Sequence, residues 1–199
     1  MAENHTTLPL FPLRTVLFPG GPLPLRIFEP RYLDMISACM KDGGPFGVIL
    51  ATPDGEGDTF SANRIGTMAN IIDWYQGSDG ILGVTAQGGA RFVLNSVEQQ
   101  SDGLYMGDYD ALDPEPAVPL PAEFKPMADL LENIIEDLGL LYTDLEKRYD
   151  DSSWVGYRFA EVLPISLDEK QLCLEQSDAV ARLEYLRPML RAVRQETSN

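Results

Sequence analysis

Hydrophobic residues recur with two different periodicities along this chain of 199 residues. In the first part, short runs rich in Val, Ile, Phe, Tyr and Trp alternate with turn-forming residues, which is the pattern of antiparallel strands. This pattern predicts strands over residues 46–50, 66–75, 81–87, 90–99 and 104–112. The turns between them are predicted at residues 52–58, 76–80, 88–89 and 101–103. Such spacing favours an antiparallel meander or a barrel.

One segment with helical periodicity interrupts the strands, over residues 30–41. Pro30 suits the first position of a helix, because the N–H that proline lacks would have no partner there. Leu33, Ile36 and Met40 recur on one face of this helix, and a pair of glycines ends the pattern. The sequence therefore predicts one short helix packed among strands.

The opening stretch, residues 8–35, sets prolines into an apolar strand pattern. Proline cannot donate a hydrogen bond to a neighbouring strand, so strands of this kind pair fully on one side only. We therefore expect them to lie at a sheet edge or to bend around a barrel. The prolines concerned are Pro9, Pro12, Pro19, Pro22 and Pro24.

A proline-rich stretch, residues 112–121, separates the part of the chain with the strand pattern from the part with the helical pattern. Such a sequence continues neither a strand ladder nor a helix, and it indicates an extended linker. The sequence therefore predicts two domains, over residues 1–115 and 116–199.

Every segment after this linker has helical periodicity, which predicts helices over residues 122–149, 152–164, 166–176 and 177–195. Ser166 and Glu169 have the spacing of a capping box at a helix start. Pro188 lies inside the last helix, where we expect a kink or an early break. The predicted apolar stripe of that helix consists of Ala179, Leu183, Leu186, Leu190 and Val193.

Charge narrows the possible functions. The net charge is −16, and the second half carries most of the acidic residues. Nucleic acids are bound mainly through Lys and Arg, so this charge balance argues against DNA or RNA as the main partner. No apolar run is long enough to cross a bilayer, and the first residues lack the pattern of a secretion signal. These two observations predict a cytoplasmic protein with no membrane partner.

Cys39 and Cys173 are isolated among apolar residues and are expected to pack as free thiols.

Catalytic motifs are missing from the sequence. It contains no Gly-Lys pair and hence no Walker A loop. The lone histidine, His5, excludes a Ser-His-Asp triad, and the lysines lie in polar surroundings unsuited to Ser-Lys chemistry. Residues 54–58 begin like an EF-hand loop but lack its glycine and its last glutamate, so they predict a solvated hairpin turn. Paired carboxylates such as Glu136 and Asp137 are more typical of a solvated helix face. We therefore expect no catalytic, cofactor-binding or metal-binding residues.

Several motifs together carry a family resemblance. They are "PLFPL" (9–13), "VLFPG" (16–20), "PLRIFEPRY" (24–32), "GGARF" (88–92) and the late block from "LP" (163–164) to "RLEYL" (182–186). Together they resemble the N-terminal domain of Lon proteases, the LON substrate-binding domain, over nearly the whole chain. The resemblance implies an α+β fold: a PUA-like β pseudo-barrel with one inserted helix, followed by a C-terminal α-helical bundle.

The resemblance also implies a function. In full-length Lon this region helps to capture polypeptide substrates, and the ATPase and Ser-Lys protease domains of Lon are not recognisable in this sequence. We therefore expect a free-standing, non-enzymatic module that binds polypeptide segments or protease or chaperone components, with its oligomeric state open. Two alternatives remain: a small-molecule-binding or hydrolytic protein that uses a groove between barrel and helical bundle, and a PUA-like RNA binder.

The candidate binding residues fall into two groups. The first is a charged cluster near the inserted helix, which is either an ion-pair network that stabilises the fold or an exposed recognition site. The second consists of aromatic residues and one arginine that either line a groove between the two domains or belong to the core. The candidates are Arg26, Glu29, Arg31, Tyr32, Trp74, Phe92, Trp154 and Arg158.

Overall fold

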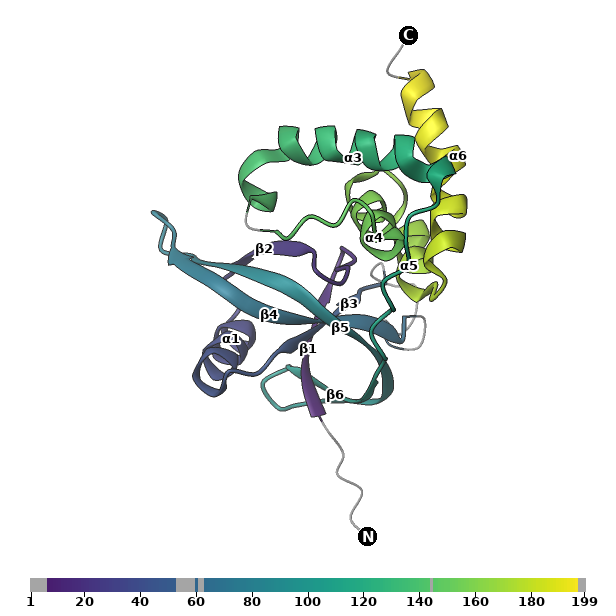
Figure 1. Ribbon diagram of the computed structural model, residues 1–199. Helices are drawn as coiled ribbons and strands as arrows, with labels where there is room; N and C mark the ends of the chain where they lie inside the picture. The colour runs from purple at the N-terminus through teal and green to yellow at the C-terminus, as the bar shows by residue number, and fades with distance from the viewer. Residues whose placement is uncertain (1–6, 53–59, 61–62, 144, 197–199) are drawn as a thin grey trace. The chain divides into compact units, whose positions relative to one another are not determined.

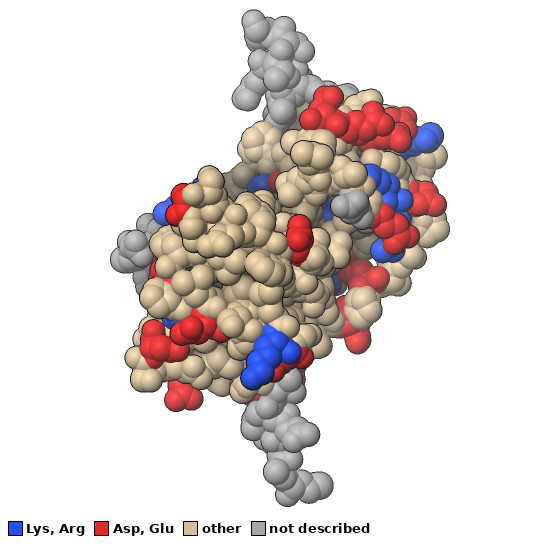
Figure 2. All heavy atoms as spheres, turned by 90° about the vertical axis from the view of Figure 1, so that its left-hand side faces the viewer, with Lys and Arg blue, Asp and Glu red and all other residues tan. Residues whose placement is uncertain are grey.

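The computed structural model describes residues 7–52, 60, 63–143 and 145–196, with only the backbone for residues 191–196. The chain forms two compact units, Met1–Pro114 and Glu115–Asn199. His5 and the EF-hand-like segment 54–58 lie outside the described residues. Figure 2 shows one face of the molecule, on which carboxylates are more prominent than Lys and Arg, in line with the net charge of −16.

The described part of the first unit contains a six-stranded sheet and the α-helix α1 (Pro30–Asp42). Five strands form a ring in the order β1, β3, β4, β5, β6. The ring closes because β1 and β5 both pair with β6, and the sixth strand, β2, pairs with β5 alone. This confirms the predicted pseudo-barrel with an inserted helix. The strands are β1 Thr7–Leu13, β2 Pro22–Ile27, β3 Phe46–Leu50, β4 Ile65–Gln76, β5 Leu82–Gln99 and β6 Tyr105–Ala111.

Four of the five prolines of the opening stretch fit this topology, whereas Pro19 lies in a turn between β1 and β2. In β1, the half that contains Pro9 pairs with β6 alone and the half that contains Pro12 pairs with β3 alone, so each proline has one open side. β2, which contains Pro22 and Pro24, pairs only with β5 and is an edge strand. The expectation of one-sided pairing is confirmed for both strands, at an edge in β2 and within the ring in β1.

The predicted turn at residues 88–89 is wrong, because β5 runs through both glycines as one strand of 18 residues. Gly88 instead allows a close approach of neighbouring backbone. A Cβ atom on Gly88 would lie 2.1 Å from the carbonyl oxygen of Phe18. Gly88 also exchanges backbone hydrogen bonds with Gly20 and Gly21, at 2.8 Å each. With its long partner β4, β5 forms a hairpin that extends beyond the other strands (Figure 1).

α1 starts at Pro30, as predicted, and ends at Gly43, whose φ of 68° is the left-handed conformation that glycine adopts readily. Its buried face differs from the predicted one, since Leu33 is only partly buried and Met40 is exposed. The ring of Tyr32 stacks on Phe11 at a centroid distance of 4.0 Å, which turns the face that contains Tyr32 to the core. The buried residues of α1 are Tyr32, Met35, Ile36 and Cys39.

The described part of the second unit is helical, which confirms the predicted helical bundle. Its first predicted helix, over residues 122–149, is too long, because Gly139 adopts a φ of 62° and ends the α-helix. The elements are the short 3-10 helix η1 Ala122–Phe124, α3 Lys125–Leu138, the 3-10 helix η2 Gly139–Tyr142, α4 Ser152–Val162, α5 Leu167–Glu175 and α6 Ala179–Glu196.

Local signals in the second unit have mixed outcomes. The capping box of Ser166 and Glu169 at the start of α5 is confirmed. Of the kink or early break expected at Pro188, the early break is wrong, since α6 continues through Pro188 to Glu196. The predicted stripe of α6 is buried as far as Leu190, and the side chain of Val193 lies outside the description. Both cysteines are buried free thiols, and none of the helices in the described ranges is long and apolar enough to span a membrane.

The proline-rich stretch is fixed to the second unit rather than extended freely. Its residues 118–120 pair with residues 150–152: Ser152 N–H donates to the carbonyl of Val118, and Leu120 N–H donates to the carbonyl of Asp150, both at 2.7 Å. Glu115 is held by side chains of α4 and α6. The stretch is therefore part of the helical unit from Glu115 onward.

Candidate functional site

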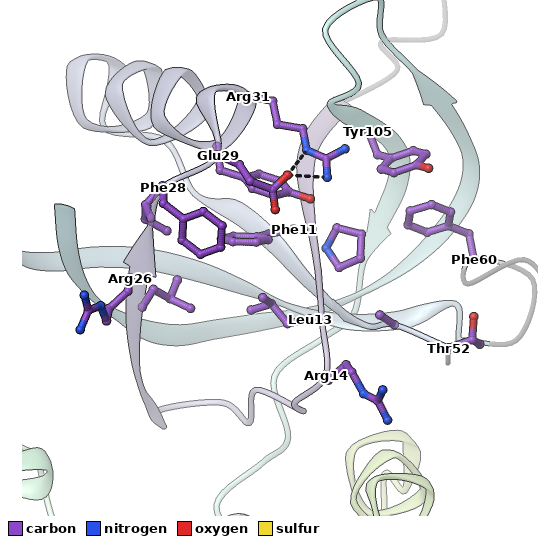
Figure 3. Close-up of a pocket in the computed structure, with 15 residues that line it drawn as sticks. Phe11, Leu13, Arg14, Arg26, Phe28, Glu29, Arg31, Thr52, Phe60 and Tyr105 are labelled. Carbon is purple, nitrogen blue, oxygen red and sulfur yellow. Dashed lines mark hydrogen bonds and ion pairs between the residues drawn. The ribbon is translucent and has the colours of Figure 1, made fainter. Parts of the chain in front are cut away.

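A pocket of about 580 Å³ opens in the first unit, where the ends of β1 and β2 meet the start of α1 (Figure 3). We call it the barrel pocket. Residues 11–13 at the end of β1 and 25–27 at the end of β2 line it, and the loop before α1 adds Phe28, which is 69% exposed. Its apolar and aromatic lining consists of Phe11, Pro12, Leu13, Leu25, Ile27, Phe28, Tyr32, Ala51, Phe60 and Tyr105.

Aromatic contacts fix the walls of the barrel pocket. The stacked rings of Phe11 and Tyr32 form one wall, and Phe60 packs against Tyr105 at a centroid distance of 4.8 Å in another. Burial raises the pKa of the Tyr32 hydroxyl, and the positive charge of Arg31 opposes this shift. Tyr32 therefore stays neutral and can act as a hydrogen-bond donor near the pocket.

Charged groups stand at the rim. Arg31 Nε donates a hydrogen bond to the Glu29 carboxylate at 3.0 Å, and Arg31 Nη2 forms an ion pair with it at 2.8 Å, as the dashed lines in Figure 3 show. Arg31 Nη1 also donates to the carbonyl of Gly103 at 2.9 Å. Arg14 lies at the opposite end of the pocket from this pair (Figure 3).

The predicted three-membered charge cluster is wrong in one respect. Arg26 forms its ion pair with Asp79 in the β4–β5 turn and not with Glu29. Arg26 is on the edge strand β2, and its side chain is 63% exposed. The ion pair at the start of α1 is therefore formed by Glu29 and Arg31 without Arg26.

The structure brings four of the eight candidates together, since Arg26, Glu29, Arg31 and Tyr32 all line the barrel pocket. Trp74 is outside its lining, on β4, and is 55% exposed. The other three candidates are buried side chains: Phe92 in the barrel core and Trp154 and Arg158 on α4 of the second unit.

Arg158 is a buried residue with a structural role in the second unit. It is fully buried, and its Nη2 lies 3.0 Å from the carboxylate of Glu161, which also accepts a hydrogen bond from the hydroxyl of Tyr142. Burial raises the pKa of Glu161, and the charge of Arg158 opposes the shift. An arginine held in this way is not accessible to a polypeptide partner.

Phe28, Phe60, Tyr105 and Arg14 were not among the candidates. Phe28 was identifiable, since it lies within the motif "PLRIFEPRY" and directly precedes Glu29. Phe60 and Tyr105 reach the pocket only through the barrel topology, for which the local sequence has no signal. Within the described ranges, no group of three or more His, Cys, Asp or Glu side chains is arranged to hold a metal ion.

Replacing Glu29 with alanine is expected to cost only about 0.5–1 kcal/mol of unfolding free energy, as for other part-exposed ion pairs. The side chains of Glu29 and Arg31 are 43% and 29% exposed, and Arg31 keeps its bond to the carbonyl of Gly103. Urea melts measure the change. A loss above about 2 kcal/mol would show that Arg31 needs its counter-charge as a buried cation does.

The comparisons with known proteins agree with this fold. The pseudo-barrel with one helix, followed by a helical unit, is the architecture of Lon N-terminal domains. The family model described as "ATP-dependent protease La (LON) substrate-binding domain" matches residues 7–192, and the chain belongs to this family. A crystal structure of a Lon N-terminal domain protein from Xanthomonas campestris is 34% identical, with a TM-score of 0.76, and the match covers 92% of this chain and 98% of that one.

More distant relatives extend the comparison. Lon protease of Anaeromyxobacter dehalogenans is 25% identical over 196 residues, which are 94% of this chain but 23% of that protein. Protein cereblon of Danio rerio is 30% identical over 123 residues, which cover 60% of this chain and 28% of cereblon. The N-terminal domain of a Mycobacterium avium complex Lon protease shares the fold, with a TM-score of 0.64 at 16% identity. The chain thus spans about a quarter of the length of the Lon proteases that it matches.

Proposed function

We propose that this protein is a non-enzymatic recognition module that binds apolar segments of other polypeptides in the barrel pocket. The observation that carries the proposal is the pocket itself, whose walls are aromatic and whose rim is polar. Ligand sites typically have several hundred Å³, mostly apolar walls and a few polar groups that fix orientation. Membership in a substrate-binding family supports the same function.

Pocket geometry favours an extended segment. The apolar walls suit one or two large side chains, because burying such groups supplies most of the free energy of binding. Arg14 and the Glu29–Arg31 pair stand at opposite ends, where they can meet backbone or side-chain polar groups that flank the buried residues. A substrate polypeptide or another protease or chaperone component would be the partner.

Replacing Phe28 with alanine is expected to weaken binding of an apolar peptide about tenfold, as for an aromatic contact at the centre of an interface. Phe28 is 69% exposed, so the substitution should leave the fold intact. The probe is the strongest binder from an array of 12-residue apolar peptides, labelled with fluorescein and titrated by anisotropy.

Ile72→Ala is the matched control, since Ile72 is 57% exposed on β4 and does not line the pocket. It should change the affinity less than twofold, as expected for a residue outside the binding site. An array with no binder above background, or equal losses in the two variants, would contradict the proposal.

A further inference from the structure

Three leucines at the end of α3 are exposed to solvent. Leu138, Leu140 and Leu141 are 48%, 93% and 41% exposed. Core packing does not use them, because α3 already buries another set of residues: Met127, Ala128, Leu131 and Ile135. Gly139, whose φ is 62°, ends α3 between Leu138 and Leu140, so the three leucines lie within four residues at that end of the helix. Contiguous exposed apolar groups of this kind mark interaction sites.

A second pocket, of about 430 Å³, lies at the same end of α3. Ile135 and Tyr142 give it an apolar wall, and Tyr149 closes another side, with its ring against Trp154 at a centroid distance of 4.9 Å. This pocket belongs to the second unit and shares no residue with the barrel pocket. Its lining includes Gly139, which lies between Leu138 and Leu140 in sequence, so the pocket offers a place for a partner side chain next to them.

The charge around these leucines is negative. Glu132 and Glu136 line the pocket, and Asp137 is exposed directly before Leu138. Lys147 is the cation in the described lining, and its ammonium donates to the carbonyl of Thr143 at 2.9 Å.

The negative potential extends into the pocket. Burial raises the pKa of the Tyr149 hydroxyl, and Glu132 and Glu136 raise it further. An apolar partner with cationic groups beside its apolar residues therefore complements the surface, whereas an anionic partner is repelled.

We propose that this surface, formed by Glu132, Glu136, Leu138, Leu140 and Leu141, binds a cationic amphipathic helix of a partner protein. We call it the leucine surface. Apolar side chains at every third or fourth position of such a helix contact the leucines, and Lys or Arg beside them pair with the two glutamates. This is a binding site in addition to the barrel pocket, and it does not depend on the proposed function of that pocket.

The test uses the full chain and two synthetic fluorescein-labelled 18-residue peptides. One has Leu at helical spacing with Lys on its flanks, and the other has Glu in place of each Lys. Anisotropy titrations should show the cationic peptide binding at least about tenfold more tightly, with an affinity that falls as salt is raised.

Variants then locate the site. Leu140→Ser is expected to weaken binding of the cationic peptide about tenfold, and the double variant Glu132→Gln with Glu136→Gln about fivefold with a flatter salt dependence. The matched controls lie on α5 and α6: Leu172→Ser, at a leucine that is 56% exposed, and Glu184→Gln, at an exposed carboxylate.

Three outcomes would overturn the proposal: equal affinity for both peptides, unchanged affinity in the leucine-surface variants, or equal losses in the controls. The last would mean that the cationic peptide binds through the overall charge of −16. Leu140 contributes little to the fold at 93% exposure, and thermal melts verify that each variant is folded. Phe28→Ala should leave binding of the cationic peptide unchanged, which separates this test from that of the barrel pocket.

Discussion

Replacing Glu115 with alanine is expected to lower the free energy of unfolding by about 3–5 kcal/mol, because the fully buried guanidinium of Arg182 then loses its counter-charge. Arg182 donates to the two carboxylate oxygens of Glu115 at 3.0 and 2.5 Å. The hydroxyl of Tyr157 donates to the same carboxylate at 2.5 Å, and that of Ser153 donates to it as well. Urea denaturation followed by tryptophan fluorescence measures the loss.

Glu123→Ala provides the control for this substitution. Glu123 also pairs with an arginine of α6, Arg187, at 3.0 Å, but the two side chains are 61% and 36% exposed. Exposed pairs contribute about 0.2–1 kcal/mol, so this variant should be nearly as stable as the original protein. Similar denaturation midpoints for Glu115→Ala and Glu123→Ala would contradict the role assigned to the buried pair.

The same carboxylate makes stability depend on pH. Burial by itself raises the pKa of Glu115, but hydrogen bonds from Arg182, Ser153 and Tyr157 outweigh it and lower the pKa below its usual 4.5. A lowered folded-state pKa means that the ionised carboxylate stabilises the fold above pH 4.5, and that this contribution is lost as pH falls through the lower value. The stability difference between the original protein and Glu115→Gln should therefore shrink below about pH 4.5. The buried Glu161, whose raised pKa has the opposite effect, is present in both proteins and cancels in this difference.

Elements that depend on neighbouring residues could be predicted from the sequence. The start of α1 at Pro30 and the capping box of Ser166 and Glu169 each involve residues within one helical turn, so local sequence suffices. The role of Gly88 could not be predicted from the sequence. The atom that requires a glycine there is the carbonyl oxygen of Phe18, which is 70 residues away in sequence but adjacent in the barrel. Locally, a Gly-Gly pair is a typical turn signal.

The candidate site shows the same division. Glu29, Arg31 and Tyr32 were found because the motif that contains them is contiguous, and the barrel then places them at one pocket. Arg26 is in the same motif, but its partner, Asp79, comes from a distant hairpin turn. Trp154 was a candidate as an aromatic residue, yet α4 is buried along most of its length, and sequence does not separate a core aromatic from a binding one.

Glu115 shows most clearly which contacts cannot be predicted from the sequence alone. It lies between two prolines in a stretch with the composition of a solvated linker, and nothing local predicts burial. Its ion-pair partner, Arg182, is 67 residues further along the chain. Arg182 also donates a hydrogen bond to the carbonyl of Cys173 at 2.8 Å. A long-range ion pair of this kind becomes visible only once the helices have been placed.

Gly88→Ala is expected to destabilise the first unit by about 3 kcal/mol, because the added methyl group collides with backbone rather than with a flexible side chain. Its Cβ would lie 2.1 Å from the carbonyl oxygen of Phe18, so the segment from Leu17 to Gly21 must move. That movement disturbs the hydrogen bonds of Gly88 with Gly20 and Gly21, and the bond from the hydroxyl of Thr67 to the carbonyl of Leu17. Urea denaturation of the whole chain, with hydrogen exchange of the amides of Gly20 and Gly88, measures both effects.

Gly44→Ala separates this contact from the general effect of replacing a glycine. A Cβ on Gly44 meets no atom within 4 Å, and its backbone does not require a glycine. This control is expected to change stability by less than about 0.5 kcal/mol, or to increase it slightly by restricting the unfolded chain. If the two variants unfold at the same urea concentration, the close approach of β5 to the segment before β2 does not limit the residue at position 88. If only Gly88→Ala loses stability, and the amides of Gly20 and Gly88 lose their protection from exchange together, the contact between the two segments is what requires glycine there.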